Sequence, residues 1–127
     1  MRAVTKNVMW LGIILILLTG LIHLIDAPDN FKDATYKGLL FVANGMGAII
    51  AAIGIYRGAR SWGWGLGLLV AVGAIIGYIV SRTIGLPGLE IDPHWSEPLG
   101  VASRIVEGLF TAAALYALSS RTVNQRT

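Results

Sequence analysis

The chain has 127 residues, of which 55% are hydrophobic and only 13% are charged, and its formal net charge is +3. Soluble domains carry about a quarter charged residues, so this composition excludes an ordinary soluble enzyme and a disordered chain. The sequence contains 16 glycines and no cysteine. The lack of cysteine excludes a disulfide scaffold, thiolate catalysis and thiolate-ligated metal centres.

Four long apolar segments determine the predicted architecture. A helix that crosses a bilayer needs about 20 mainly apolar residues. Segments 7–25, 37–56, 62–81 and 99–119 meet that requirement, and the first is interpreted as a retained helix because its apolar run is longer than that of a signal peptide. We predict an all-α fold with one domain over residues 1–127. It is an integral membrane four-helix bundle of up-down-up-down topology, with outer loops at 26–36 and 82–98 and a tight basic turn at 57–61.

The distribution of charge predicts the orientation in the membrane. Six basic and no acidic residues fall at the two termini and the 57–61 turn: Arg2, Lys6, Arg57, Arg60, Arg121 and Arg126. The positive-inside rule therefore places both termini in the cytoplasm, and a bacterial inner membrane is the expected location. Because this distribution accounts for the pI of 9.6, we expect no nucleic-acid partner. Aromatic residues predicted at the outer boundary are Phe31, Tyr36 and Trp95.

Small and polar residues recur every three or four positions along each apolar segment, which places them on one helix face. Such residues let helix backbones approach closely in lipid. Three pairs also have the spacing of a helix-dimer motif: Gly54 with Gly58, Gly63 with Gly67, and Gly73 with Gly77. Packing within the bundle is favoured over a dimer interface for these pairs.

Polar residues gather in the outer half of the predicted bundle. Thr19, Asn44 and Glu107 fall at one depth, with His23 one turn above and Arg104 on the Glu107 face. A carboxylate at that depth is unfavourable unless it is neutral, paired or hydrogen-bonded. Two interpretations stay open, namely an internal network that fixes helix register and a ligand, metal or proton site. The candidate residues are Thr19, His23, Asn44, Arg82, Glu97, Arg104 and Glu107.

A divalent metal ion, zinc or copper, is a further candidate, because imidazole and carboxylate groups suit both metals. The candidate ligands are His23, Asp26, His94 and Glu107. Their spacing matches no established metal-binding pattern, and a solvated acidic loop is the alternative. Phosphate-binding, hydrolase and metalloprotease motifs are absent from the sequence, so no catalytic residue is assigned and a non-enzymatic role is favoured.

Several short motifs resemble a group of small bacterial four-span membrane proteins with no established activity. They are His23-x-x-Asp26-Ala27-Pro28, the Arg-Thr-x-Gly-x-Pro element over 82–87, Glu97-Pro98-x-Gly100 and Glu107. The resemblance implies a four-helix fold and places His23, Arg82, Pro87, Glu97 and Glu107 in a shared pattern. Members of the group often carry an acidic residue near position 103, where this chain has serine.

The Arg82 element suggests how the longer outer loop is held. A guanidinium at the end of the third helix is expected to reach Glu97 or Glu107 across the bundle. Gly85 and Pro87 then let the loop fold back as a lid above His23 and Glu107.

Three functions are considered. The first is an accessory or structural subunit of a larger membrane complex, in contact with the lipid bilayer and with a membrane-protein partner or further copies of itself. The second is a protein that binds a metal ion or small polar ligand through His23, Arg82 and Glu107. The third is a proton-coupled carrier or enzyme that uses Glu107.

Overall fold

The computed structural model describes residues 5–126, with side chains described as far as residue 119. The chain forms α1 (Lys6–Asp33), α2 (Thr35–Tyr56), the π-helical turn η1 (Arg60–Trp64), α3 (Gly65–Thr83) and α4 (Pro98–Arg126), and the described residues form no strand. Four helical segments are long and apolar enough to cross a membrane: Lys6–Asp33, Thr35–Tyr56, Arg60–Thr83 and Pro98–Ser119. The predicted all-α fold with four spanning helices is confirmed.

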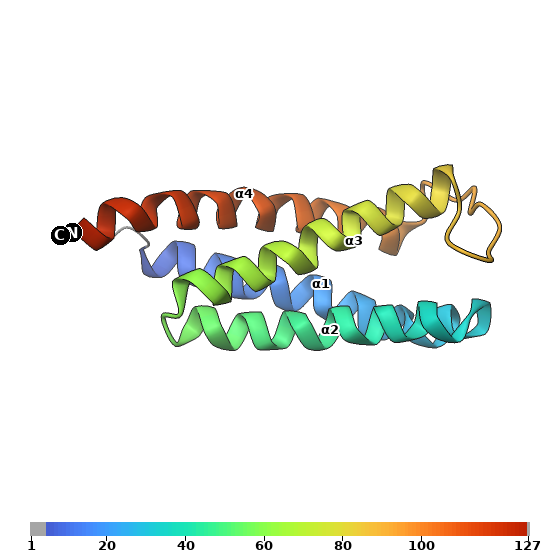
Figure 1. Cartoon of the computed structure of the whole chain (residues 1–127), viewed down its shortest axis with the longest axis horizontal. Coiled ribbons are helices and arrows are strands. Elements are labelled where there is room, and N and C mark those ends of the chain that lie inside the picture. Colours follow the sequence, from blue (N-terminus) through green and yellow to red (C-terminus); the bar gives the residue numbers. More distant parts are fainter. Residues whose placement is uncertain (1–4, 127) are drawn as a thin grey trace.

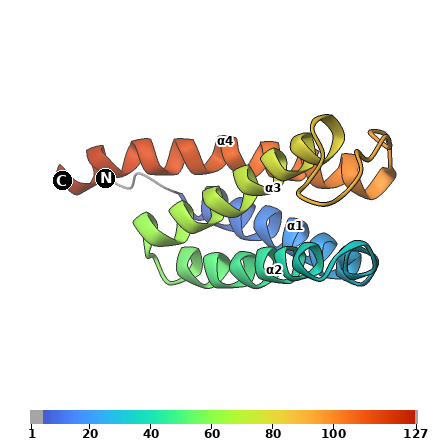
Figure 2. The ribbon, with the colours of Figure 1, turned by 45° about the vertical axis from the view of Figure 1, so that its right-hand side comes forward.

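The four helices lie side by side around one core (Figure 1). Each helix packs against the next in the chain order α1, α2, α3, α4, and α4 packs back against α1. The beginning of α1, the α2–α3 turn and the end of α4 share one end of the bundle, and the turned view agrees (Figure 2). The α1–α2 junction and the 84–97 loop lie at the other end, called here the loop end.

The prediction of a loop over 26–36 is wrong. Helix α1 continues to Asp33, and only Ala34 is extended before α2 begins at Thr35. The amide of Asn30 donates to the Asp26 carbonyl at 2.8 Å, and Pro28 removes only one helical hydrogen bond. The polar composition that suggested a loop is therefore compatible with helix, because polar groups at the end of a span are satisfied locally.

The half of the core nearer the α2–α3 turn is built from large rings placed against glycines. Trp64 and Phe110 are buried and stack with centroids 5.6 Å apart. A Cβ at Gly67 would lie 2.5 Å from the Phe110 ring, and one at Gly12 would overlap Trp64. Small residues on these helix faces therefore serve packing within the bundle, as predicted for Gly63 and Gly67.

The connection between α2 and α3 is a tight turn, as predicted for the basic segment 57–61. Gly58 has a φ of +80°, which favours glycine, and one π-helical turn leads into α3. Gly54 and Gly63 bring the two backbones together, because a Cβ on Gly63 would lie 2.7 Å from the Gly54 carbonyl carbon. Gly73 and Gly77 differ, since a Cβ at either position meets no atom within 4 Å.

The end of the bundle with the α2–α3 turn carries Lys6, Arg57 and Arg60, as the charge distribution requires. Arg2 lies outside the described residues. Arg121 and Arg126 lie in α4, but their side chains are outside the described part.

Replacing Gly63 with alanine is expected to separate α2 from α3, because two backbones meet there and neither can yield. We expect the apparent Tm of the protein in detergent to fall by about 5 °C or more. The matched control is Gly73→Ala, where the added methyl group meets open space, and its Tm should change by about 1 °C at most. Thermal unfolding monitored by circular dichroism measures both. Equal losses in the two variants would contradict the packing described here.

Candidate functional site

Glu107 on α4 is fully buried and accepts four hydrogen bonds. Thr19 of α1 donates to Oε2 at 2.5 Å, and Ser103 donates to the same oxygen at 2.7 Å. Arg104 donates from Nε to Oε1 at 2.6 Å and from Nη2 to Oε2 at 2.9 Å. The carboxylate thus joins α1 to α4 inside the bundle. We call Thr19, His23, Ser103, Arg104 and Glu107 the Glu107 network.

His23 occupies the edge of this network, one turn above Thr19 on α1. Its Nδ1 lies 2.7 Å from the Thr19 carbonyl oxygen. A carbonyl only accepts, so Nδ1 carries the proton and donates it. The other ring nitrogen, Nε2, lies 3.8 Å from Glu107 Oε2. The ring packs on Phe41 of α2, with centroids 5.1 Å apart. His23 is therefore oriented by its own helix and faces the carboxylate without a short hydrogen bond to it.

Helical spacing explains why these side chains meet. Ser103 and Arg104 precede Glu107 by four and three residues, so all three share one face of α4. Thr19 and His23 have the same relation on α1. An ion pair removed from water is favourable only if its remaining hydrogen-bonding groups are satisfied. Hydroxyl donors from Thr19 and Ser103 meet that condition for the carboxylate.

The ring of Tyr78, on α3, connects the Glu107 network to the 84–97 loop. The guanidinium carbon of Arg104 lies 4.4 Å from the ring centroid, and that of Arg82 lies 3.8 Å from it. Both distances are typical of cation–π contacts. The Tyr78 hydroxyl donates to the Trp95 carbonyl at 2.7 Å, and Trp95 packs edge-on against the ring.

Arg82 does not reach Glu97 or Glu107, which corrects the sequence prediction. Its Nη2 lies 3.3 Å from Asp92 Oδ2, and its guanidinium donates to the His94 carbonyl. Arg104 already occupies Glu107, and Glu97 is exposed just before α4 begins. Arg82 stands at the end of α3, so the nearest carboxylate is the one on the loop that follows.

Asp92 holds the loop against the end of α3. Burial would raise the pKa of Asp92, but hydrogen bonds from the backbone and ring of His94 and the charge of Arg82 outweigh it. The net result is a pKa below the usual range. The Asp92 backbone N–H also donates to the Ser81 carbonyl at 2.9 Å. These contacts fold the loop back along the bundle.

The tip of the loop is a type II turn. The N–H of Leu89 donates to the Leu86 carbonyl, with Pro87 and Gly88 at the central positions and a φ of +76° at Gly88. The Tyr36 hydroxyl donates to the Pro87 carbonyl at 2.5 Å, which ties the turn to the beginning of α2. The fold-back predicted from Gly85 and Pro87 is observed, and its role as a lid above His23 and Glu107 stays a prediction.

Asn44 lies apart from the Glu107 network. Its amide donates to the Val70 carbonyl at 3.1 Å and so joins α2 to α3. Its buried Oδ1 accepts no hydrogen bond from the described residues. Placement at the depth of Thr19 was not sufficient to bring it to Glu107, because it lies on a face of α2 that meets α3.

The predicted metal site is not formed. His94 is exposed on the loop and bonded to Asp92, whereas His23 and Glu107 are buried in the bundle, and Asp26 lies on α1. Among residues 5–119, no three histidine or acidic side chains are grouped closely enough to hold a metal ion. Because Arg104 and two hydroxyls occupy Glu107, the carboxylate is not directed at a shared centre with His94.

Three residues of this arrangement were absent from the predicted site, namely Ser103, Tyr78 and Asp92. Ser103 stands four residues before Glu107, and Tyr78 stands four residues before Arg82, so helical spacing contained a signal for both. Asp92 carried no such signal, because its partner depends on how the loop folds. No protein-family model, curated protein or solved structure matches the chain. The resemblance to the four-span group therefore stays a prediction.

Glu107→Gln is expected to destabilise the bundle, because it leaves the Arg104 charge partly buried without its counter-charge. The expected loss is about 3 kcal/mol in the free energy of unfolding. Reversible unfolding in mixed micelles measures it, and Glu97→Gln, which alters an exposed carboxylate just before α4 begins, should change it by about 0.5 kcal/mol at most.

A second comparison separates charge pairing from packing. The double variant Arg104→Met with Glu107→Leu should be more stable than Glu107→Leu alone, because it removes both charges together. If the double variant were the less stable of the two, the Arg104–Glu107 pair would not be the reason for the loss.

Proposed function

We propose that the chain is an accessory or structural subunit that packs against another protein within a membrane. A bacterial inner membrane with both termini in the cytoplasm is part of this proposal. It is supported by Lys6, Arg57 and Arg60 at the end of the bundle that also carries the end of α4. The four apolar helices make the chain a small membrane protein whose helices contact lipid.

The use of Glu107 supports a structural role for the polar interior. The carboxylate that the carrier and ligand hypotheses require already accepts four hydrogen bonds from its own bundle. Any ligand that bound it would have to displace Arg104 or a hydroxyl donor. The network therefore favours a fixed helix arrangement.

The observation that carries the proposal is the open pair of glycines on α3. Gly73 and Gly77 stand four residues apart, and a Cβ at either one would meet no neighbouring atom within 4 Å. By contrast, Gly12, Gly63 and Gly67 are each filled by another part of the bundle. The glycines that the fold needs are thus distinct from a pair that it leaves unused.

A pair of this spacing is suited to a second helix in lipid. Helix association there depends on close packing, and two glycines one turn apart permit close backbone approach. Exposed Leu69 and Ile76 lie beside the pair and supply apolar contact area. We infer that this face of α3 is where the partner helix packs.

The test is native mass spectrometry of the protein gently extracted from its membrane. The wild-type chain should appear with a different protein in fixed stoichiometry. Gly73→Ile with Gly77→Ile should reduce that complex about tenfold while leaving the Tm of the bundle close to wild type. Gly108→Ile is the matched control, because Gly108 lies exposed on α4 with the same open space.

Gly108→Ile should retain the partner. A species that contains only this chain, monomeric or homo-oligomeric, would contradict the accessory role. Loss of the complex in the Gly108 variant but not in the α3 variant would contradict the assignment of the face.

A further inference from the structure

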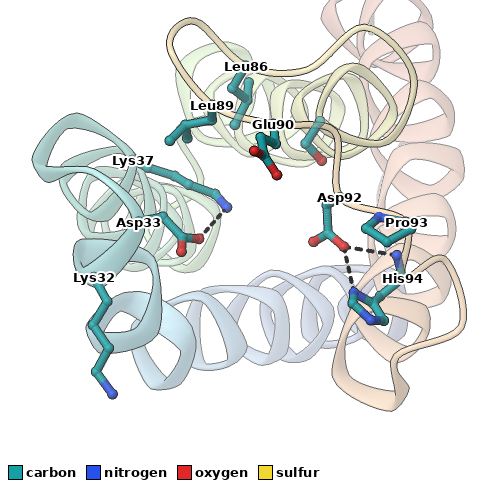
Figure 3. A pocket seen from close by; sticks show the side chains of 10 residues that line it. Lys32, Asp33, Lys37, Leu86, Leu89, Glu90, Asp92, Pro93 and His94 are labelled. Atoms are coloured by element: carbon teal, nitrogen blue, oxygen red, sulfur yellow. Dashed lines mark hydrogen bonds and ion pairs between the residues drawn. The ribbon is translucent and has the colours of Figure 1, made fainter.

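A polar cleft of about 480 Å³ lies at the loop end of the bundle (Figure 3). One wall is formed by the end of α1 and the beginning of α2, and the other by the 84–97 loop and the end of α3. Its volume falls in the range typical of sites for small molecules. The cleft is separate from the Glu107 network, none of whose residues lines it.

The wall formed by α1 and α2 carries both lysines of the cleft together with Asp33. Lys37 enters from α2, and its Nζ donates to Asp33 Oδ2 at 2.9 Å. An ammonium has three donors, so two remain after that bond. The Lys37 side chain is only 13% exposed, so it lies within the cleft and does not extend into solvent.

The opposite wall presents carboxylates. Glu90 points into the space between Lys37 and Asp92 (Figure 3). Asp92 is committed to Arg82 and His94, but Glu90 forms no ion pair or hydrogen bond with any residue whose side chain is described. Within the cleft, the Lys37 ammonium with its spare donors therefore faces the carboxylate of Glu90, which has no such partner. Lys32, the other lysine of the lining, pairs with Asp29 and points away from Glu90 (Figure 3).

The position of the cleft indicates what it meets. Phe31, Tyr36 and Trp95 are partly exposed at the same end of the bundle. Aromatic side chains of this kind are enriched at the level of lipid headgroups. Tyr36 also fixes the loop that forms one wall, through its hydrogen bond to Pro87. A cleft at the level of the lipid headgroups opens onto the charged groups of those headgroups.

We propose that this cleft binds the ammonium–phosphate group of an ethanolamine phospholipid. The phosphate accepts hydrogen bonds from Lys37, and the primary ammonium donates to Glu90. Leu86 and Leu89 line the cleft and give the methylene groups an apolar contact. Soluble phosphoethanolamine carries the same two charged groups and is the alternative source of the ligand. This inference is independent of the proposed packing through α3.

The chemistry of the headgroup predicts that the cleft is selective among lipids. Phosphatidylglycerol has the phosphate but no cation, so Glu90 would lack a partner and repel it. Phosphatidylcholine has a quaternary ammonium, which cannot donate a hydrogen bond to a carboxylate. The cleft should therefore prefer the ethanolamine lipid over both.

The experiment is a lipid titration of the full-length protein in detergent, followed by native mass spectrometry with three lipids of matched acyl chains. The wild-type protein should retain phosphatidylethanolamine with an apparent affinity about tenfold above that for the other two. Glu90→Gln should reduce this preference about tenfold without changing the Tm. Lys37→Gln should do the same, and Glu90→Gln keeps the test valid if loss of the Lys37–Asp33 pair affects folding.

Two charge-matched variants serve as controls. Glu97→Gln removes an exposed carboxylate that does not line the cleft, and Lys6→Gln removes an ammonium at the opposite end of the bundle. Both should retain the wild-type preference. Competition by soluble phosphoethanolamine would support recognition of the headgroup from either source, and lipid retention that resists it would support a lipid ligand.

Equal retention of the three lipids by the wild-type protein would overturn the proposal. A preference for phosphatidylethanolamine that survives in Glu90→Gln and in Lys37→Gln would place the lipid elsewhere, and would also overturn it.

Discussion

A carboxylate in the apolar interior of a bundle must find all of its partners within that bundle, and Glu107 sets this constraint here. Its partners come from α1 and from its own helix, α4. The charge of Arg104 in turn lies against the ring of Tyr78 on α3, and the guanidinium of Arg82 contacts the same ring. Because Arg82 holds Asp92, the arrangement of the 84–97 loop follows from contacts that begin at a buried acid.

The two ends of the molecule are stabilised by different physics. The half nearer the α2–α3 turn fits large rings onto glycines, as with Phe110 on Gly67, and gains its stability from close packing. The half nearer the loop end uses charged and hydroxyl side chains whose geometry fixes orientation. Packing of the rings tolerates apolar variation of equal volume, whereas the Glu107 network depends on each donor and acceptor. The face of α3 that carries Gly73 takes part in neither, because no other part of the bundle packs against that glycine.

Local periodicity was enough to predict the spans and the core of the polar network. Arg104 and Glu107 share a helix face by spacing alone, and depth counting placed Thr19 opposite them. Contacts that depend on the rotation of a helix or the path of a loop were beyond the sequence. Two examples are the hydrogen bond from Asn44 to Val70, which depends on the rotation of α2, and the pairing of Arg82 with Asp92, which depends on the path of the loop. The helical course of 26–36 was missed because polar composition alone does not distinguish a loop from the end of a long helix.

Thr19 and Glu107 join α1 to α4, and a double-mutant cycle on this pair tests that contact most directly. Thr19→Val and Glu107→Leu would be combined, and the free energy of unfolding of all four proteins measured in mixed micelles. We expect a coupling energy of about 1 kcal/mol or more, because Thr19 loses the carboxylate as its acceptor once Glu107 is removed. Additivity to within about 0.3 kcal/mol would contradict it and would show that the two helices are held together by packing alone.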